Sequence, residues 1–88
     1  SIDDGALKAL QGGKSLLPAG VVSIGGEFQK GDAVIVVNGN GTEVGRGLAS
    51  YSAADARLLM GHKSSEIEDL LGYRGSDELI HRDDLVLS

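Results

Sequence analysis

The sequence contains no cysteine and no tryptophan, and it has a single proline. Without cysteine there can be no disulfide, no thiolate metal ligand and no cysteine nucleophile. Small secreted domains often depend on disulfides, so the absence favours a reducing compartment and a cytoplasmic location. No apolar run approaches the roughly 20 residues of a membrane-spanning helix, and we expect no membrane contact.

Positive charge is also scarce, because 13 acidic residues outnumber 8 lysines and arginines and leave a net charge of −5. Nucleic-acid binding depends largely on basic side chains that contact phosphate, so non-specific binding is disfavoured. The eight lysines and arginines could still form a local basic patch. With 88 residues the chain is one domain, residues 1–88, with little room for the large pocket that most enzymes use.

The first half of the chain predicts one helix and two strands. Asp3 and Asp4 are placed to cap a helix that ends at residues 12–13, where two glycines follow one another. Alternation over residues 21–28 predicts a half-buried strand. The β-branched run at residues 33–37 predicts a central strand covered on both faces.

The second half begins with a hairpin turn at residues 38–41, since Asn and Gly accept the positive φ that such turns need. The returning strand, residues 44–51, carries Gly45 and Gly47 on one face, where another part of the backbone should approach closely. Capping patterns that begin at Ser52 and Ser65 then predict two short helices.

Residues 79–80 and 85–87 complete the pattern as one or two short closing strands. Tight turns between successive strands make the sheet mainly antiparallel. We therefore predict a mainly β fold with short α-helices (α+β), a small partly closed barrel. The predicted core consists of Val22, Ile24, Val34, Ile35, Val36, Leu48, Ile67, Leu70, Leu71 and Val86.

Two short motifs are similar to parts of phosphoryl-transfer enzymes, but in both cases a residue that the full motif requires is missing. Gly13-Lys14-Ser15 resembles the end of a phosphate-binding loop, but the position of the earlier glycine is occupied by Lys8. His81-Arg82-Asp83 matches the start of a kinase catalytic loop, but its later asparagine would fall at Ser88. We therefore predict no catalytic residue, no cofactor and no metal site in this chain.

Several longer blocks closely resemble the C-terminal PUA domain of bacterial glutamate 5-kinases. They are residues 13–21 (GKSLLPAGV), 46–48 (RGL), 71–73 (LGY) and 80–87 (IHRDDLVL), with Gly25, Phe28, Gly31 and Asp32 between them. The resemblance runs nearly end to end. It implies a PUA pseudo-barrel of mixed, mostly antiparallel strands, in which the first strand is clipped at the start of this chain.

The same resemblance implies a larger parent protein. Its kinase domain would phosphorylate glutamate with ATP and Mg²⁺ in the first step of proline synthesis, and none of that domain is in this chain. The implied partners are the kinase domain and neighbouring subunits, with regulation and assembly as the role. The alternative is RNA, which PUA domains of other proteins bind.

The resemblance loosely places a binding face on the first helix, the loop after it and nearby strands. The candidate RNA- or partner-binding residues are Lys14, Ser15, Pro18, Gly20, Arg46, His81 and Arg82. Each has a structural alternative: Pro18 and Gly20 would set a turn, Arg46 would pair with an acid, and His81 would cap an edge strand.

Between the two roles, charge and ring count favour protein contacts. Single-stranded RNA is commonly held by bases stacked on aromatic rings, and the chain offers only Phe28, Tyr51 and Tyr73. A patch of Lys14, Arg46 and Arg82 could still dock a structured RNA by shape. We expect a regulatory role through protein contacts, and weak RNA binding at best.

Overall fold

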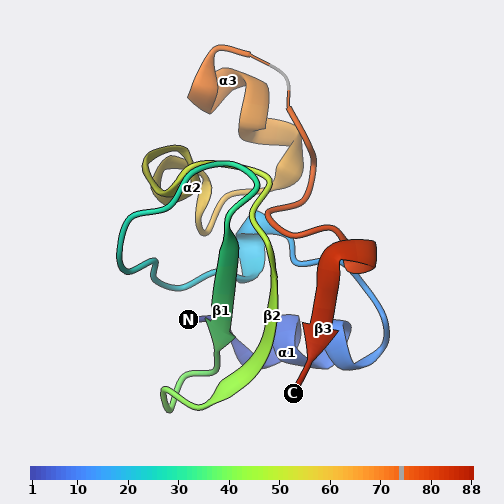
Figure 1. The fold of residues 1–88 in the computed structure, drawn as a ribbon. Coiled ribbons are helices and arrows are strands. Elements are labelled where there is room, and N and C mark those ends of the chain that lie inside the picture. The colour runs from blue at the N-terminus through green and yellow to red at the C-terminus, as the bar shows by residue number, and fades with distance from the viewer. Residues whose placement is uncertain (74) are drawn as a thin grey trace.

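The computed structural model describes residues 1–73 and 75–88. Three strands form one sheet, with α1 near one end of it and α2 and α3 at the other (Figure 1). The elements are α1 (Asp4–Gln11), β1 (Ala33–Val37), β2 (Glu43–Leu48), α2 (Ala53–Leu59), α3 (Ile67–Leu71) and β3 (Leu85–Leu87), with 3-10 turns at Pro18–Gly20, Ser64–Glu66 and Arg82–Asp84. Among the described helices, none has the length and apolar character needed to cross a membrane.

The first helix forms as its capping residues predict. The Asp3 carboxylate accepts a hydrogen bond from the Ala6 N–H at 2.7 Å, which satisfies one of the free amides at the helix start. Gly12 caps the other end, and Gly13 follows at φ +81°. Leu10 is buried, so α1 lies against the core by its apolar side.

The sheet has the order β1-β2-β3, and both ladders are antiparallel. The predicted hairpin turn is present, and Gly41 adopts the positive φ, at +81°, whereas neither asparagine does. The Asn38 side chain accepts hydrogen bonds from the N–H groups of Asn40 and Thr42. Antiparallel bridges join Ile2 to Val21 and Leu16 to Ile80 and help the chain to curl around its core. The mainly β, barrel-like α+β fold is therefore confirmed.

The two glycines of β2 lie where β3 and the chain before it cross closely. A Cβ on Gly45 would lie 2.9 Å from the Val86 carbonyl oxygen, and one on Gly47 would lie 2.5 Å from the Ile80 Cγ2. The predicted close approach is confirmed, because a Cβ at either position would meet the backbone of β3 or the side chain of Ile80.

Two predicted elements of the chain are wrong. Residues 21–28 form no strand, because only Val21 pairs and Gly26 turns the chain at φ +73°. The capping box predicted at Ser65 is also absent: Ser65 lies inside a 3-10 turn, and α3 starts at Ile67 without a side-chain cap. Ser52, in contrast, caps α2 through the Asp55 N–H as predicted.

The core differs from the prediction on one face of the sheet. Val36 and Ile67 are buried, and Ile24, Val34, Leu70 and Leu71 pack partly buried against the core. Exposure contradicts the prediction for Val22, Ile35, Leu48 and Val86. The strand β1 is also not central, since it lies at one end of the sheet order. A run of apolar residues predicts a strand, but it does not say that both faces are covered.

Candidate functional site

The loop after α1 and the segment before β3 lie side by side. The Leu16 N–H donates to the Ile80 carbonyl at 2.9 Å, and the Leu79 N–H donates to the Leu16 carbonyl at 2.8 Å. This bridge brings Ser15 to Arg82, whose backbone N–H donates to the Ser15 Oγ at 2.8 Å. The structure thus joins two of the predicted site residues, 67 positions apart in the sequence.

His81 begins the 3-10 turn that leads into β3. Its Nδ1 accepts a hydrogen bond from the Asp83 N–H at 3.1 Å, so the ring proton of the neutral form is on Nε2. The Asp83 carboxylate lies 3.6 Å from the same nitrogen. The ring is therefore already engaged in capping, in line with the structural alternative for this residue.

Pro18 and Gly20 shape the turn between the loop and the core. Pro18 is fully buried, and its carbonyl accepts hydrogen bonds from the N–H groups of Val21 and Gly61. A Cβ on Gly20 would lie 2.5 Å from the Cβ of Ala6, so this position allows close contact with α1. Neither side chain presents a polar group to a ligand.

A groove of about 560 Å³ runs beside α1, and it brings together Lys14, Ser15 and Gly20. Its lining also includes Asp3 and Glu78, so two carboxylates accompany the one lysine. The groove is electrostatically mixed. It does not form the continuous basic channel that a phosphate backbone would favour.

Arg46 lies on β2, in a different part of the molecule from that groove. Its guanidinium forms two hydrogen bonds with the Glu43 carboxylate, at 3.0 and 3.2 Å. The bond from Arg46, followed by one from the Ser88 hydroxyl, lowers the pKa of Glu43. The Glu43 carboxylate in turn raises the pKa of Arg46. The predicted pairing of Arg46 with an acid is therefore observed.

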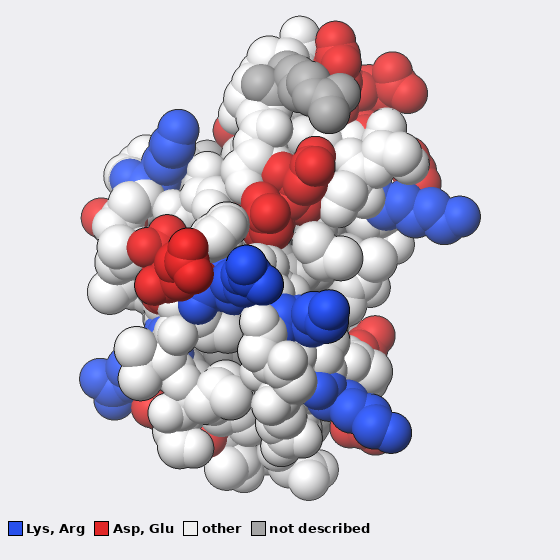
Figure 2. All heavy atoms as spheres, turned by 90° about the vertical axis from the view of Figure 1, so that its right-hand side faces the viewer, with Lys and Arg blue, Asp and Glu red and all other residues white. Residues whose placement is uncertain are grey.

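The wider charge distribution repeats this mixture. Figure 2 views the side of the molecule on which β3 lies, and lysine and arginine side chains gather in the middle of that face. Acidic side chains lie directly beside and above them. The positive potential of this face is therefore interrupted by neighbouring carboxylates.

The aromatic rings offer little surface for stacking. Tyr51 is buried and its hydroxyl donates to the Ser76 carbonyl, while Phe28 packs partly buried against the core. Tyr73 is exposed, but its hydroxyl donates to the Asp55 carboxylate at 2.7 Å. That hydrogen bond raises the pKa of Tyr73, and burial raises the pKa of Tyr51. The one exposed ring among the described residues thus lies beside a negative charge.

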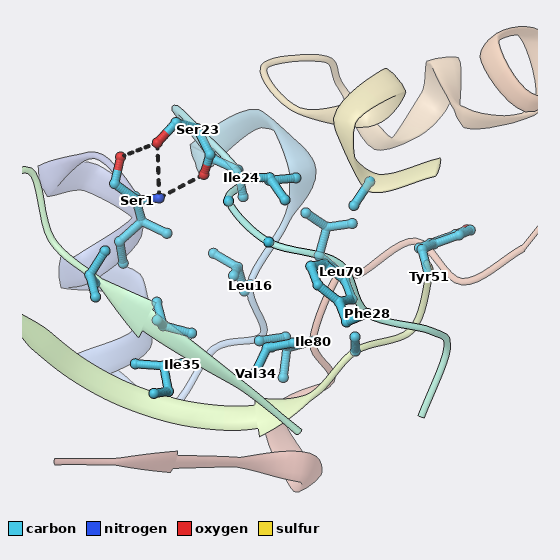
Figure 3. A pocket seen from close by; sticks show the side chains of 18 of the residues that line it. Ser1, Leu16, Ser23, Ile24, Phe28, Val34, Ile35, Tyr51, Leu79 and Ile80 are labelled. Carbon is cyan, nitrogen blue, oxygen red and sulfur yellow. Dashed lines mark hydrogen bonds between the residues drawn. The ribbon is translucent and has the colours of Figure 1, made fainter. Parts of the chain in front are cut away.

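An apolar cavity of about 410 Å³ lies between β1 and the loop of residues 24–28 (Figure 3). Leu16, Phe28 and Leu79 are among its walls, and the Ser1 amino group at its margin donates to the Ser23 carbonyl at 2.6 Å. Most of the lining is aliphatic, and Ser1, Ser23, Glu27 and Tyr51 also contribute to it. Among residues 1–73 and 75–88, no cluster of three His, Asp or Glu side chains could hold a metal ion.

The most distinctive surface was missed by the sequence reasoning. Ile35, Leu48 and Val86 form what we call the outer sheet patch, with side chains 57%, 45% and 73% exposed. Ile35 and Val86 flank Arg46 in one row across the sheet, and Leu48 pairs with Ala33 in the next row. The sequence shows that these three residues are apolar, and they were therefore assigned to the core. It does not show which of the apolar residues lie at the surface.

The fold and these surfaces define a small α+β barrel domain, and the chain belongs to the PUA domain family, whose model matches residues 1–71. Two solved structures share the fold. A conserved PUA domain protein from Thermoplasma acidophilum aligns with a TM-score of 0.59 and 20% identity over 91% of this chain and 44% of that one. A PUA domain from Aeropyrum pernix K1, solved as a tartrate complex, aligns with a TM-score of 0.62 and 25% sequence identity. That alignment covers 94% of this chain and 42% of the other.

Among curated proteins, the chain is similar to glutamate 5-kinases. It is 58% identical over 86 residues to that of Paramagnetospirillum magneticum and 58% identical over 87 residues to that of Agrobacterium fabrum. The alignments cover 98% and 99% of this chain but only 23% and 22% of the two enzymes. The chain therefore spans less than a quarter of the length of these relatives.

Proposed function

We propose that this chain is the non-catalytic PUA domain of a cytoplasmic glutamate 5-kinase. The parent enzyme would phosphorylate glutamate with ATP and Mg²⁺, the first step of proline synthesis, through a domain outside this chain. The observation that carries the assignment is the 58% identity over nearly the whole chain to two such enzymes. This domain would act on assembly and on feedback inhibition by proline through contacts with the kinase domain and neighbouring subunits.

Four features support protein contacts over RNA. The groove beside α1 has two carboxylates for its one lysine, and Arg46 is neutralised by Glu43. The exposed ring of Tyr73 lies against Asp55. The outer sheet patch, in contrast, exposes three aliphatic side chains in adjacent rows of one sheet face, where a protein partner could make apolar contacts.

RNA binding stays the second candidate because one observation favours it. The groove beside α1 gathers Lys14, Ser15 and Gly20, and Ser15 in turn contacts the backbone of Arg82. A structured RNA could dock there through a few phosphates despite the net charge of −5. Such binding would weaken steeply with salt, because it would depend on those contacts alone.

Two measurements separate the candidates. The first compares proline inhibition and oligomer mass of the parent enzyme with and without residues 1–88, and we expect both to change on deletion. The second titrates the enzyme with structured and single-stranded RNA at physiological salt. Tight, salt-sensitive binding that Lys14→Glu abolishes, together with unchanged inhibition and assembly on deletion, would overturn the regulatory role in favour of RNA.

A further inference from the structure

The outer sheet patch differs from the other exposed apolar side chains. Leu17, Val22 and Leu58 are also exposed, but they lie on three separate segments, and single apolar residues are normal on protein surfaces. Leu87 of β3 is 40% exposed as well, but it pairs with Gly45 on the opposite face of the sheet. Ile35 and Val86 occupy the same row of the ladder, and Leu48 occupies the next. The three apolar residues therefore lie on one face of the sheet, one on each strand, with Arg46 between Ile35 and Val86.

One charged side chain stands within these two rows, and it is itself 66% exposed. Arg46 stands between Ile35 and Val86, and its guanidinium is held by Glu43, toward the start of β2 and away from Leu48. An arginine held in this way can lay its methylene stem along apolar neighbours. The surface offers a partner aliphatic contact with a charge that is already paired, which fits another protein surface better than a polyanion.

The size of the patch limits what can occupy it. Strands lie about 4.8 Å apart, so the patch spans about 10 Å across the three strands and covers on the order of 200 Å². Freely associating partners usually bury about 800 Å² each. A tether changes this requirement, because it holds the second surface at a high effective concentration. The occupant that fits a small aliphatic patch is therefore a domain of the same polypeptide.

The geometry points to the outer sheet patch as the surface by which this domain docks on the kinase domain of its own enzyme. This inference rests on the proposed function. In the two related enzymes, more than three quarters of the chain lies outside the part that aligns with these residues. The matching surface on the kinase domain would be aliphatic, and Arg46 with Glu43 would lie at the contact and help to fix its orientation.

The first test identifies the occupant by photo-crosslinking in the full-length enzyme. A benzoylphenylalanine is placed at the position of Val86, and a matched one at Val22, which is equally apolar and 61% exposed but lies outside the patch. We expect crosslinks from position 86 to peptides of the kinase domain and none from position 22. Crosslinks from position 86 to residues 1–88 of a second copy, to RNA, or to nothing would each overturn the inference.

The second test measures coverage in the same full-length protein. Because this domain has no cysteine, Val86→Cys and Val22→Cys each place one thiol in it, and peptide mass spectrometry reports the alkylation rate at each. We expect position 86 to react at least about tenfold more slowly, as docked surfaces are shielded except during opening. Equal rates would overturn the inference.

These outcomes are separable from the proposed function. If position 86 crosslinks to the kinase domain but deletion of this domain leaves proline inhibition and assembly unchanged, docking holds and the regulatory role fails. If deletion changes both but position 86 is free, the regulatory role holds and the docking surface is wrong.

Discussion

The two faces of the three-stranded sheet are built from alternate residues of the same strands, and they differ in what covers them. On the inner face, Val36 is 5% exposed, and a Cβ on Gly45 or Gly47 would meet β3 or Ile80, although Leu87 of β3 is 40% exposed. On the outer face, Ile35 and Val86 are more than half exposed. Both faces carry aliphatic side chains, so their burial depends on which parts of the chain pack against each face.

The comparison is tested most strongly by placing the same charge on each face. Val36→Asp would bury an unpaired carboxylate, and we expect a loss of more than about 3 kcal/mol in the free energy of unfolding, enough to unfold the domain. Ile35→Asp, one residue away, puts the carboxylate in solvent and should leave the chain folded. Circular dichroism during thermal unfolding measures both. Equal melting temperatures for the two variants would mean that the inner and outer faces are wrongly assigned.

A smaller effect is expected where the inner face has no room for a methyl group. In Gly47→Ala the new Cβ would lie 2.5 Å from the Ile80 Cγ2 and 3.0 Å from the Asp84 carbonyl oxygen. Relief requires β3 and its turn to shift, which should cost about 1–3 kcal/mol of unfolding free energy. Gly39→Ala is the control, because no atom lies within 4 Å of its Cβ position. Chemical denaturation compares the two, and an equal midpoint would contradict the close packing.

Features that depend on neighbouring residues in the sequence, such as helix caps and the hairpin turn, were predicted correctly. Asp3 and Ser52 form the cap bonds that their side chains predict, the hairpin turns at residues 38–41, and β1 and β2 fall close to the predicted strands. Alternation over residues 21–28 failed because a strand also needs a partner, which a one-dimensional pattern does not contain. The exposure of Ile35 and Val86 was not predicted either, because the sequence pattern does not show which face of a strand is covered.

The candidate site was predictable only in part. The resemblance selected residues that the structure places in two locations: Lys14, Ser15 and Gly20 share the groove beside α1, whereas Arg46 lies on the sheet. The contact of Ser15 with Arg82 arises from the Leu16–Ile80 bridge, and no local sequence signal carries that information. The outer sheet patch was missed because its apolar residues satisfied the rule for a core.

A still smaller change in stability is expected when the outer face is made polar. Ile35→Ser combined with Val86→Ser removes aliphatic side chains that are already exposed, so unfolding free energy should change by about 1 kcal/mol or less. The same pair should weaken docking in the full-length enzyme. Val22→Ser is the matched control. A large drop in melting temperature for the double variant would indicate that these side chains support the barrel itself.

The smallest expected effect concerns the charge pair of the outer face. Hydrogen bonds from Arg46 and then Ser88 lower the pKa of Glu43 from its ordinary value of 4.5, against a smaller opposing effect of desolvation. A carboxyl with a lowered folded-state pKa stabilises the fold above its unfolded pKa, and this contribution is lost as the pH falls through the folded value. Any acid sensitivity from this pair should therefore appear only below about pH 4.5.

Arg46→Gln should return the pKa of Glu43 toward 4.5, whereas Ser88→Ala should move it less, because the Arg46 bond is the larger cause. Carbon NMR titration of the Glu43 carboxyl group measures both shifts. An unchanged pKa in Arg46→Gln would mean that the guanidinium is not held by Glu43 in solution, and the outer face would then carry an unpaired positive charge open to phosphate.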